Sequence, residues 1–333
     1  MIRSHSRRSC MTLASGALAS VIFFAAAGCA APQEAPARSP SVLKVRTEVV
    51  NVYAVVRDKA GKRVSNLTKD DFELTEDGAP QTVRYFSRAT DTPLTLALMI
   101  DTSPSQQRVL PLEQKEAIDF INEVMRPKDL MCVLHFDVEV ELLQDFTASA
   151  SFLTRAIAGT VINGGAQGPL PGTFPSQGAG ATHLYDALWL VSTQLMNTQV
   201  GRKVAVMLTD GEDQGSKESL NATLEAAQKA NLIIYSVDIA DRAFYGIHDL
   251  GFSGGSVLKK FSEATGGEVI QATVQEDASA AFREIADQLR TQYLLGYTPT
   301  NLARDGKYRK IRVRVRGQSY KVQARRGYYA PSK

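Results

Sequence analysis

Cysteine is scarce in this chain of 333 residues, which contains three cysteines and one tryptophan. Cys132 lies alone in the apolar segment 130–136, and its expected state is a buried, chemically inert thiol. Cys10 lies within an apolar N-terminal segment, and Cys29 follows it directly. If Cys29 is lipidated, Cys132 has no partner and the mature protein contains no intramolecular disulfide.

Several enzyme motifs are also missing. The four histidines show no H-E-x-x-H spacing, and the chain has no phosphate-binding loop of the Walker type. The segment Gly251–Gly255 matches the G-x-S-x-G motif of serine hydrolases, but no convincing strand precedes it, and the last histidine, His248, comes before Ser253. Hydrolases of that fold have a strand before the serine and the histidine after it. We therefore expect a glycine-rich loop around Ser253 and no enzymatic activity.

An excess of charge of one sign is missing as well. The formal net charge is +3, and residues 1–28 contain three arginines and no acidic residue. The remaining chain is neutral overall, which argues against nucleic acid as a partner. With 44% hydrophobic and 22% charged residues, the composition is typical of a globular protein with a sizeable core.

The first 28 residues have the pattern of an export signal. A basic start is followed by an uncharged apolar segment that ends in two alanines and a glycine directly before Cys29. This ending resembles a bacterial lipobox, which implies that Cys29 becomes the lipidated N-terminus. Ala26 replaces the usual leucine, so ordinary cleavage and a secreted form are an alternative. A second alternative is that the apolar segment is retained as a membrane anchor, although about 18 apolar residues are marginal for crossing a bilayer.

These features predict an exported protein of the cell envelope, a lipoprotein anchored in the membrane and facing the periplasm or the exterior. Residues 29–42 are rich in proline and are expected to form a semi-extended tether between the membrane and the folded part of the chain.

From residue 94 onwards, apolar strands alternate with helical patterns. Strands are expected at 94–100, 130–136, 138–143, 203–209, 232–239 and 267–271. Helices are expected at 111–125, 149–158, 184–196, 217–230, 256–265 and 277–291. Only Asp137 separates the second and third strands, which indicates one antiparallel edge strand. We therefore predict an α/β domain over 91–292 with a doubly wound, mostly parallel, Rossmann-like sheet.

The segments on either side of this domain have an alternating β pattern. Strands are expected within 43–57, at 72–75 and 81–86, and again at 293–297, 308–315 and 320–324. Neither segment is long enough to bury a core by itself. We therefore predict that residues 43–90 and 293–333 pair in a small β-sandwich, into which the α/β domain is inserted.

Polar side chains follow two of the apolar strands. Asp101, Ser103 and Ser105 come directly after the first strand of the α/β domain, and Asp210 follows the fourth. Open α/β sheets bind ligands beyond the carboxyl ends of their strands, and oxygen donors suit hard divalent cations. Thr182, just before an apolar helix, adds another hydroxyl. Alone, the D-x-S-x-S segment is equally compatible with a capped turn, because Asp and Ser are common N-cap residues.

Together, these residues resemble the metal-ion-dependent adhesion site of von Willebrand factor A domains. The resemblance implies that Ser103, Ser105 and Thr182 contact Mg²⁺ (or Mn²⁺ or Ca²⁺) directly. It also implies that Asp101 and Asp210 hold the water molecules of the ion. The resemblance further implies that a carboxylate from a partner protein completes the coordination. The residue between the two serines is proline, where the family commonly has glycine, but this position supplies no side-chain ligand.

Over its whole length the chain is also similar to the VWFA-related domain proteins common in Acidobacteria. The segments that carry this similarity are Leu67–Leu74, Glu76–Gly78, Leu184–Leu188, Thr209–Asp213 and Tyr293–Pro299. The resemblance implies a von Willebrand A fold and metal-dependent protein binding rather than catalysis.

The functional hypothesis is a membrane-tethered, extracytoplasmic adhesion or scaffold module that binds a partner protein through this metal site. The alternative is a metal-independent structural scaffold of the cell envelope, and a hydrolase is the least favoured. The glycine- and proline-rich segment 163–181 is either a recognition loop beside the metal or a linker. The basic segment 304–326 is either an anionic docking surface or a solvated face. The helix 277–292 leads directly into the C-terminal β segment and is expected to relay the state of the site.

Overall fold

The computed structural model describes residues 48–88, 92–162, 182–239, 254–272, 275–317 and 319–332. The predicted signal peptide, Cys29 and the tether lie outside the described residues, as do the segment 163–181, His248 and Ser253. Within the described ranges, no helix has both the length and the apolar character that a membrane crossing requires.

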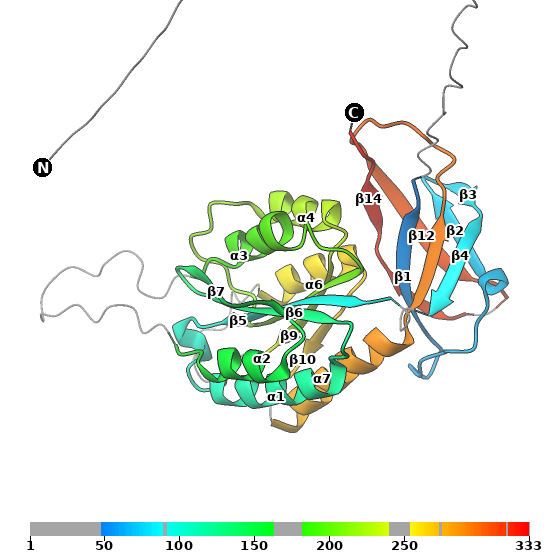
Figure 1. Cartoon of the computed structure of the whole chain (residues 1–333). Helices are drawn as coiled ribbons and strands as arrows, with labels where there is room; N and C mark the ends of the chain where they lie inside the picture. Colours follow the sequence, from blue (N-terminus) through cyan, green and yellow to red (C-terminus); the bar gives the residue numbers. More distant parts are fainter. Residues whose placement is uncertain are drawn as a thin grey trace, which may run out of the picture. The chain divides into compact units, whose positions relative to one another are not determined.

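A six-stranded sheet forms the centre of the α/β part (Figure 1). Its strands are β5 (Leu94–Asp101), β6 (Leu130–Phe136), β7 (Val140–Thr147), β8 (Arg202–Thr209), β9 (Ile233–Asp238) and β10 (Val269–Gln271). The strand order is β10-β9-β8-β5-β6-β7, and only the pairing of β6 with β7 is antiparallel. The predicted fold class is confirmed, including the antiparallel edge strand after Asp137.

Helices cover both faces of this sheet. They are α1 (Leu110–Val124), α2 (Ala150–Ala158), α3 (Leu184–Leu190) with its π-helical continuation η4 (Val191–Leu195), α4 (Leu220–Lys229), α6 (Gly254–Thr265) and α7 (Gln275–Thr291). Each corresponds to a predicted helix, with ends that differ by a few residues. Helix α4, for example, begins later than predicted because the Ser219 hydroxyl accepts a hydrogen bond from the Ala222 N–H (3.2 Å) and caps it there.

The side chains of β5 show why both faces need helices. Every residue of this strand is buried. Leu98 packs in one apolar layer with Phe120 of α1, whereas Met99 packs in the opposite layer with Leu258 of α6. Successive side chains of a strand point to opposite faces, so a continuous apolar run requires cover on both. Figure 1 shows α1, α2 and α7 on one side of the sheet and α3, α4 and α6 on the other.

Two smaller antiparallel sheets form the β part. Their strands are β1 (Val50–Arg57), β2 (Phe72–Glu76) after the 3-10 turn η1 (Lys69–Asp71), β3 (Ala79–Gln81), β4 (Val83–Arg88), β11 (Tyr293–Tyr297), β12 (Tyr308–Val315), β13 (Lys321–Ala324) and β14 (Gly327–Tyr329). The orders are β13-β1-β11-β4 and β14-β12-β2-β3, so strands from before and after the α/β part share each sheet. Apolar side chains of both sheets, such as Val52 and Ile311, form one core. The residue bounds of the domains remain a prediction.

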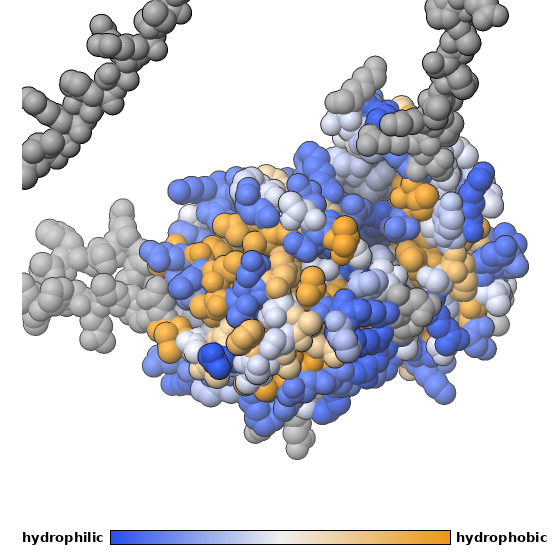
Figure 2. Space-filling view, viewed as in Figure 1, coloured by the Kyte–Doolittle hydropathy of each residue, from blue (hydrophilic) through white to orange (hydrophobic). Residues whose placement is uncertain are grey.

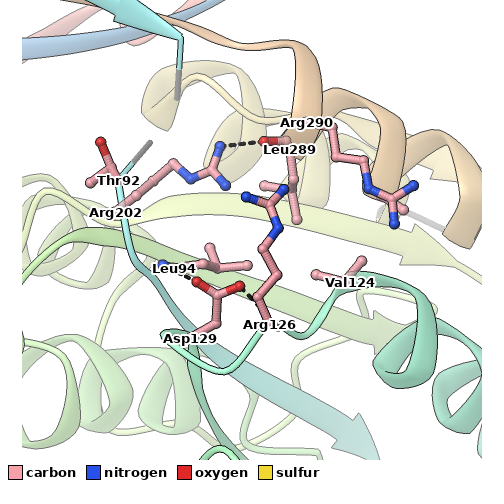
Figure 3. A pocket seen from close by; sticks show the side chains of 9 residues that line it. Thr92, Leu94, Val124, Arg126, Asp129, Arg202, Leu289 and Arg290 are labelled. Atoms are coloured by element: carbon pink, nitrogen blue, oxygen red, sulfur yellow. Dashed lines mark hydrogen bonds between the residues drawn. The ribbon is translucent and has the colours of Figure 1, made fainter. Parts of the chain in front are cut away.

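A buried arginine joins the end of α7 to the amino-terminal end of the central sheet by hydrogen bonds (Figure 3). Arg202, the first residue of β8, is 3% exposed and donates hydrogen bonds to the Leu289 carbonyl (2.5 Å) and to Gln292 Oε1 (3.1 Å). Figure 3 shows Asp129 nearby, where it accepts a hydrogen bond from the Arg126 N–H (3.1 Å). Because a buried guanidinium requires acceptors, Arg202 holds the last turn of α7 against β8.

Apolar side chains gather on the face that carries the edge strand β7 (Figure 2). Leu142 of β7 is 42% exposed, and Phe152 of the neighbouring α2 is 50% exposed. Glu141 and Asp145 interrupt the apolar side chains of the same strand. Charges on an edge strand oppose its pairing with the edge of another sheet.

Cys132 gives a direct test of this core. It is fully buried in β6, and burial, with a smaller effect of Asp145, raises the pKa of its thiol from 9.0 to about 12. The fragment 43–333 contains no other cysteine. Because the thiolate is the reactive species, we expect a disulfide reagent at pH 8 to react about 10³-fold more slowly with the folded fragment than with the fragment in urea. Rapid stoichiometric labelling of the folded fragment, followed by absorbance, would contradict this placement of β6.

Candidate metal centre

The carboxyl ends of β5 and β8 bring two aspartates together. The two strands are parallel neighbours, with Ile100 opposite Leu208. Asp101 ends β5 and is 0% exposed, and Asp210 follows β8 and is 1% exposed. Because parallel strands end at the same edge of a sheet, the two carboxylates occupy the crevice where ligands of open α/β sheets bind.

Short hydrogen bonds hold Asp101 in place. Its Oδ1 accepts from the backbone N–H of Ser103 (2.9 Å), and its Oδ2 accepts from the hydroxyl of Thr209 (2.6 Å). The first of these bonds folds the chain back directly after β5, and the second joins the ends of the two strands. Thr209 therefore supports the site, a role that the sequence pattern does not reveal.

The two serines of the D-x-S-x-S segment lie on the same side of the loop. Ser103 precedes the 3-10 turn η3 (Pro104–Gln106), in which Ser105 follows the proline. The hydroxyls of Ser103 and Ser105 are 3.1 Å apart, and Ser105 donates to Asp210 Oδ2 (2.8 Å). The side-chain amide of Gln106 donates to the same oxygen (2.8 Å). One buried polar network thus contains four of the five predicted site residues.

Thr182 is the fifth predicted residue. It is 5% exposed and lies two residues before α3. Its backbone carbonyl accepts from the N–H of Gln214 (2.8 Å), which places it against the loop that follows Asp210. The described contacts do not join the hydroxyl of Thr182 to the other four residues. His183, which follows it, donates its backbone N–H to the Asp137 carbonyl (2.7 Å).

A close approach between two backbone segments positions the Asp210 loop. Gly211 has a φ of +82°, which favours glycine, and it packs against Gly254 at the start of α6. A Cβ atom at Gly254 would lie 2.1 Å from the Asp210 carbonyl oxygen. Glu212 adds a link, since its Oε1 accepts from the Gly254 N–H (3.2 Å). Gly254 belongs to the G-x-S-x-G match of the sequence, and its role here is backbone packing.

Burial and neighbouring carboxylates disfavour the ionised form of two acidic side chains at the site. Burial raises the pKa of Asp101, and the charge of Asp210 adds to the rise. On α1, burial likewise raises the pKa of Glu113, with smaller contributions from Asp101 and Asp210. A nearby cation favours the ionised form of such carboxylates, so a divalent ion at this position would stabilise all three.

The donor set suits a hard divalent cation. Within the described ranges, no group of three or more His, Cys, Asp or Glu residues is arranged to hold a metal ion. The site instead combines two buried aspartates with neutral hydroxyls. Such oxygen donors are typical for Mg²⁺, Mn²⁺ or Ca²⁺, whereas structural zinc prefers cysteine and histidine. Several buried polar atoms nearby, including Gln106 Oε1 and both carboxylate oxygens of Glu113, have no hydrogen-bond partner among the described residues. The residues present therefore fit a hydrated divalent ion.

No protein-family model and no curated protein matches this sequence. The similar solved structures include von Willebrand factor A domains. One is a von Willebrand factor type A protein from Catenulispora acidiphila, with 12% identity over 79% of this chain and 75% of that chain and a TM-score of 0.48.

Proximal thread matrix protein 1 from the mussel byssus is also similar, with 14% identity, 65% of this chain and 51% of that chain covered, and a TM-score of 0.49. A second structure of it has a zinc-occupied MIDAS motif (15% identity, 62% and 48% covered, TM-score 0.47). This chain spans about half the length of the mussel protein. The placement of the site residues rests on the sheet and loops described above, not on these similarities.

The basic segment lies on β12, in a different sheet from the strands that carry this centre. Lys310, Arg312 and Arg314 alternate along β12 and are exposed. Arg314 lies opposite Glu73 of β2, which also pairs with Arg316 (3.5 Å). The two interpretations of this segment, a solvated face and an anionic docking surface, stay predictions.

The two glycines at the start of α6 offer a matched test of the loop packing. We expect Gly254→Ala to force the Asp210 backbone to move, because the new Cβ has no room. The expected cost is about 1–3 kcal/mol of stability, measured by urea denaturation. A displaced Asp210 is also expected to weaken Mn²⁺ binding about 10–100-fold, measured by calorimetry.

Gly255→Ala is the control, since its Cβ would meet only Asp238 Oδ2 at an ordinary 3.5 Å. Stability is expected to stay the same or to rise slightly, because alanine is favoured over glycine in a helix. Equal stability and equal Mn²⁺ affinity of the two variants would contradict the proposed packing of Gly254 against the Asp210 loop.

Proposed function

We propose that this protein is an exported, membrane-tethered adhesion or scaffold module that binds a partner protein through a divalent metal ion. The observation that carries the proposal is the convergence of Asp101, Ser103, Ser105 and Asp210 at the carboxyl ends of β5 and β8. Burial of two neighbouring carboxylates costs free energy, and a cation bound between them and the hydroxyls would offset this cost.

Each residue has a proposed role. The hydroxyls of Ser103, Ser105 and Thr182 hold Mg²⁺, or Mn²⁺ or Ca²⁺ in its place, and the carboxylates of Asp101 and Asp210 orient water molecules of the ion. The bound ion supplies an electrophilic position for a carboxylate of the partner protein. Thr209 and the N–H of Ser103 keep Asp101 oriented whether or not a partner is present. We propose that the protein binds its partner without acting as an enzyme.

A metal-independent scaffold is the second candidate, and one observation favours it. The hydrogen bonds from Ser105 to Asp210 and from Thr209 to Asp101 connect the ends of β5 and β8 directly through side chains. In that case the same residues only stabilise the edge of the sheet, and binding occurs on another surface.

Removal of Asp101 tests the metal site. We expect calorimetry to show saturable binding of Mg²⁺ and Mn²⁺ to the protein, with an affinity at least about 100-fold lower for Asp101→Ala. Asp119→Ala is the control, because Asp119 is an exposed carboxylate on α1 whose side chain is 63% accessible. A chelator is then expected to abolish the capture of acidic partner proteins.

Two results would count against the metal-dependent function. Equal binding by wild type and Asp101→Ala would place the ion elsewhere. Partner capture that persists in the presence of the chelator would favour the metal-independent scaffold.

Membrane attachment is the remaining part of the proposal. Cys29 follows two alanines and a glycine, and its lipidation would anchor the tether 29–42. We expect Cys29→Ala to move the protein from the membrane fraction to the soluble extracytoplasmic fraction and to abolish labelling with a radioactive fatty acid. Unchanged membrane association of the variant would favour a retained apolar anchor instead.

A further inference from the structure

Glu113 is an acidic residue within the apolar face of α1. Leu110, Ala117 and Phe120 of the same helix belong to the apolar layer beneath the sheet, and their spacing places Glu113 on the same face. Glu113 is 0% exposed. Neither of its carboxylate oxygens has a hydrogen-bond partner among the described residues, which is true of no other buried carboxylate there. A buried, unpartnered carboxylate is costly, so this position requires an explanation.

The helix start places Glu113 beside the metal centre. The N–H of Val109 donates to the Gln106 carbonyl (3.0 Å), and the N–H of Glu113 donates to the Val109 carbonyl (3.0 Å). Glu113 therefore lies one turn beyond the loop whose side chains bind Asp210. Among the described residues, no cation forms an ion pair with it. The charges that act on it most are those of Asp101 and Asp210.

We propose that Glu113 is a third carboxylate of the metal centre, which accepts hydrogen bonds from water molecules of the bound ion. This proposal rests on the proposed function. The three acidic residues are not arranged as a common ligand group, which favours a contact through water over direct coordination. A third carboxylate strengthens the attraction of the centre for the cation, so the site holds its ion before a partner arrives.

The same helix supplies a matched control. Glu116 is 4% exposed, and unlike Glu113 its carboxylate has a partner, Lys115 Nζ (2.7 Å). Replacement of either glutamate by glutamine removes one buried carboxylate from α1 and keeps the shape of the side chain. Only the change at position 113 is expected to affect the ion.

The test is a calorimetric titration of the full-length protein in detergent with Mg²⁺ and with Mn²⁺ alone. We expect Glu113→Gln to raise the Kd for both ions at least about tenfold, and Glu116→Gln to leave it within about twofold of the wild type. The thermal midpoint of the metal-free protein is expected not to fall in Glu113→Gln, because an unpaired buried acid is removed. The rise of the midpoint on addition of Mn²⁺ is expected to shrink. Glu113→Met, similar in length but apolar, gives a second variant should the first fail to fold.

The outcomes separate this inference from the proposed function. Wild-type affinity in both Glu113 variants would overturn the role of Glu113 alone and leave the metal site intact. Absence of Mg²⁺ and Mn²⁺ binding by the wild type would overturn both proposals. An equal loss of affinity in Glu116→Gln would show that any change of charge on α1 has the same effect, and would also overturn the role of Glu113.

Discussion

The parallel pairing of β5 with β8 is the constraint on which the candidate centre depends. It places Asp101 and Asp210 at one edge of the sheet, where the apolar strands end. Two buried carboxylates at neighbouring strand ends repel each other and lose hydration, so the chain must supply hydrogen-bond donors. The hydroxyls of Thr209 and Ser105 and the amide of Gln106 are such donors. The geometry of the loops follows from this requirement.

Backbone packing then limits how far the loops can adjust. Gly211 and Gly254 approach so closely that neither position accepts a side chain without movement of the chain. The packing of Gly211 against α6 therefore fixes the Asp210 loop, and Asp101 is fixed as the last residue of β5. A site that is rigid before ligand binding loses less conformational entropy when an ion or a partner binds.

Helix α7 connects the α/β part with the β part through charged contacts. Glu284 accepts from Arg57 of β1 (3.0 Å) and from Arg63 (2.5 Å), and Asp287 accepts from Arg63 (2.6 Å). Arg202 holds the end of the same helix. Single exposed ion pairs contribute little, but a partly buried network with several shared partners resists rearrangement. Any relay of the metal state through α7 must therefore break or shift these contacts.

Local patterns in the sequence determined the strands, the helices and most of the centre. The apolar run before Asp101 requires a buried strand, the short connection 137–139 between β6 and β7 forces a reversal, and the D-x-S-x-S spacing places oxygen donors on one loop. The sequence contains Glu113 within the apolar stripe of α1, but Glu113 was not among the residues predicted for the site, because the stripe alone does not show which charges lie opposite it. Packing between elements decided the rest. Glu113, Gly254 and Thr209 reach the centre only because α1, α6 and β8 converge there, and contacts between distant segments leave no periodic trace in the sequence.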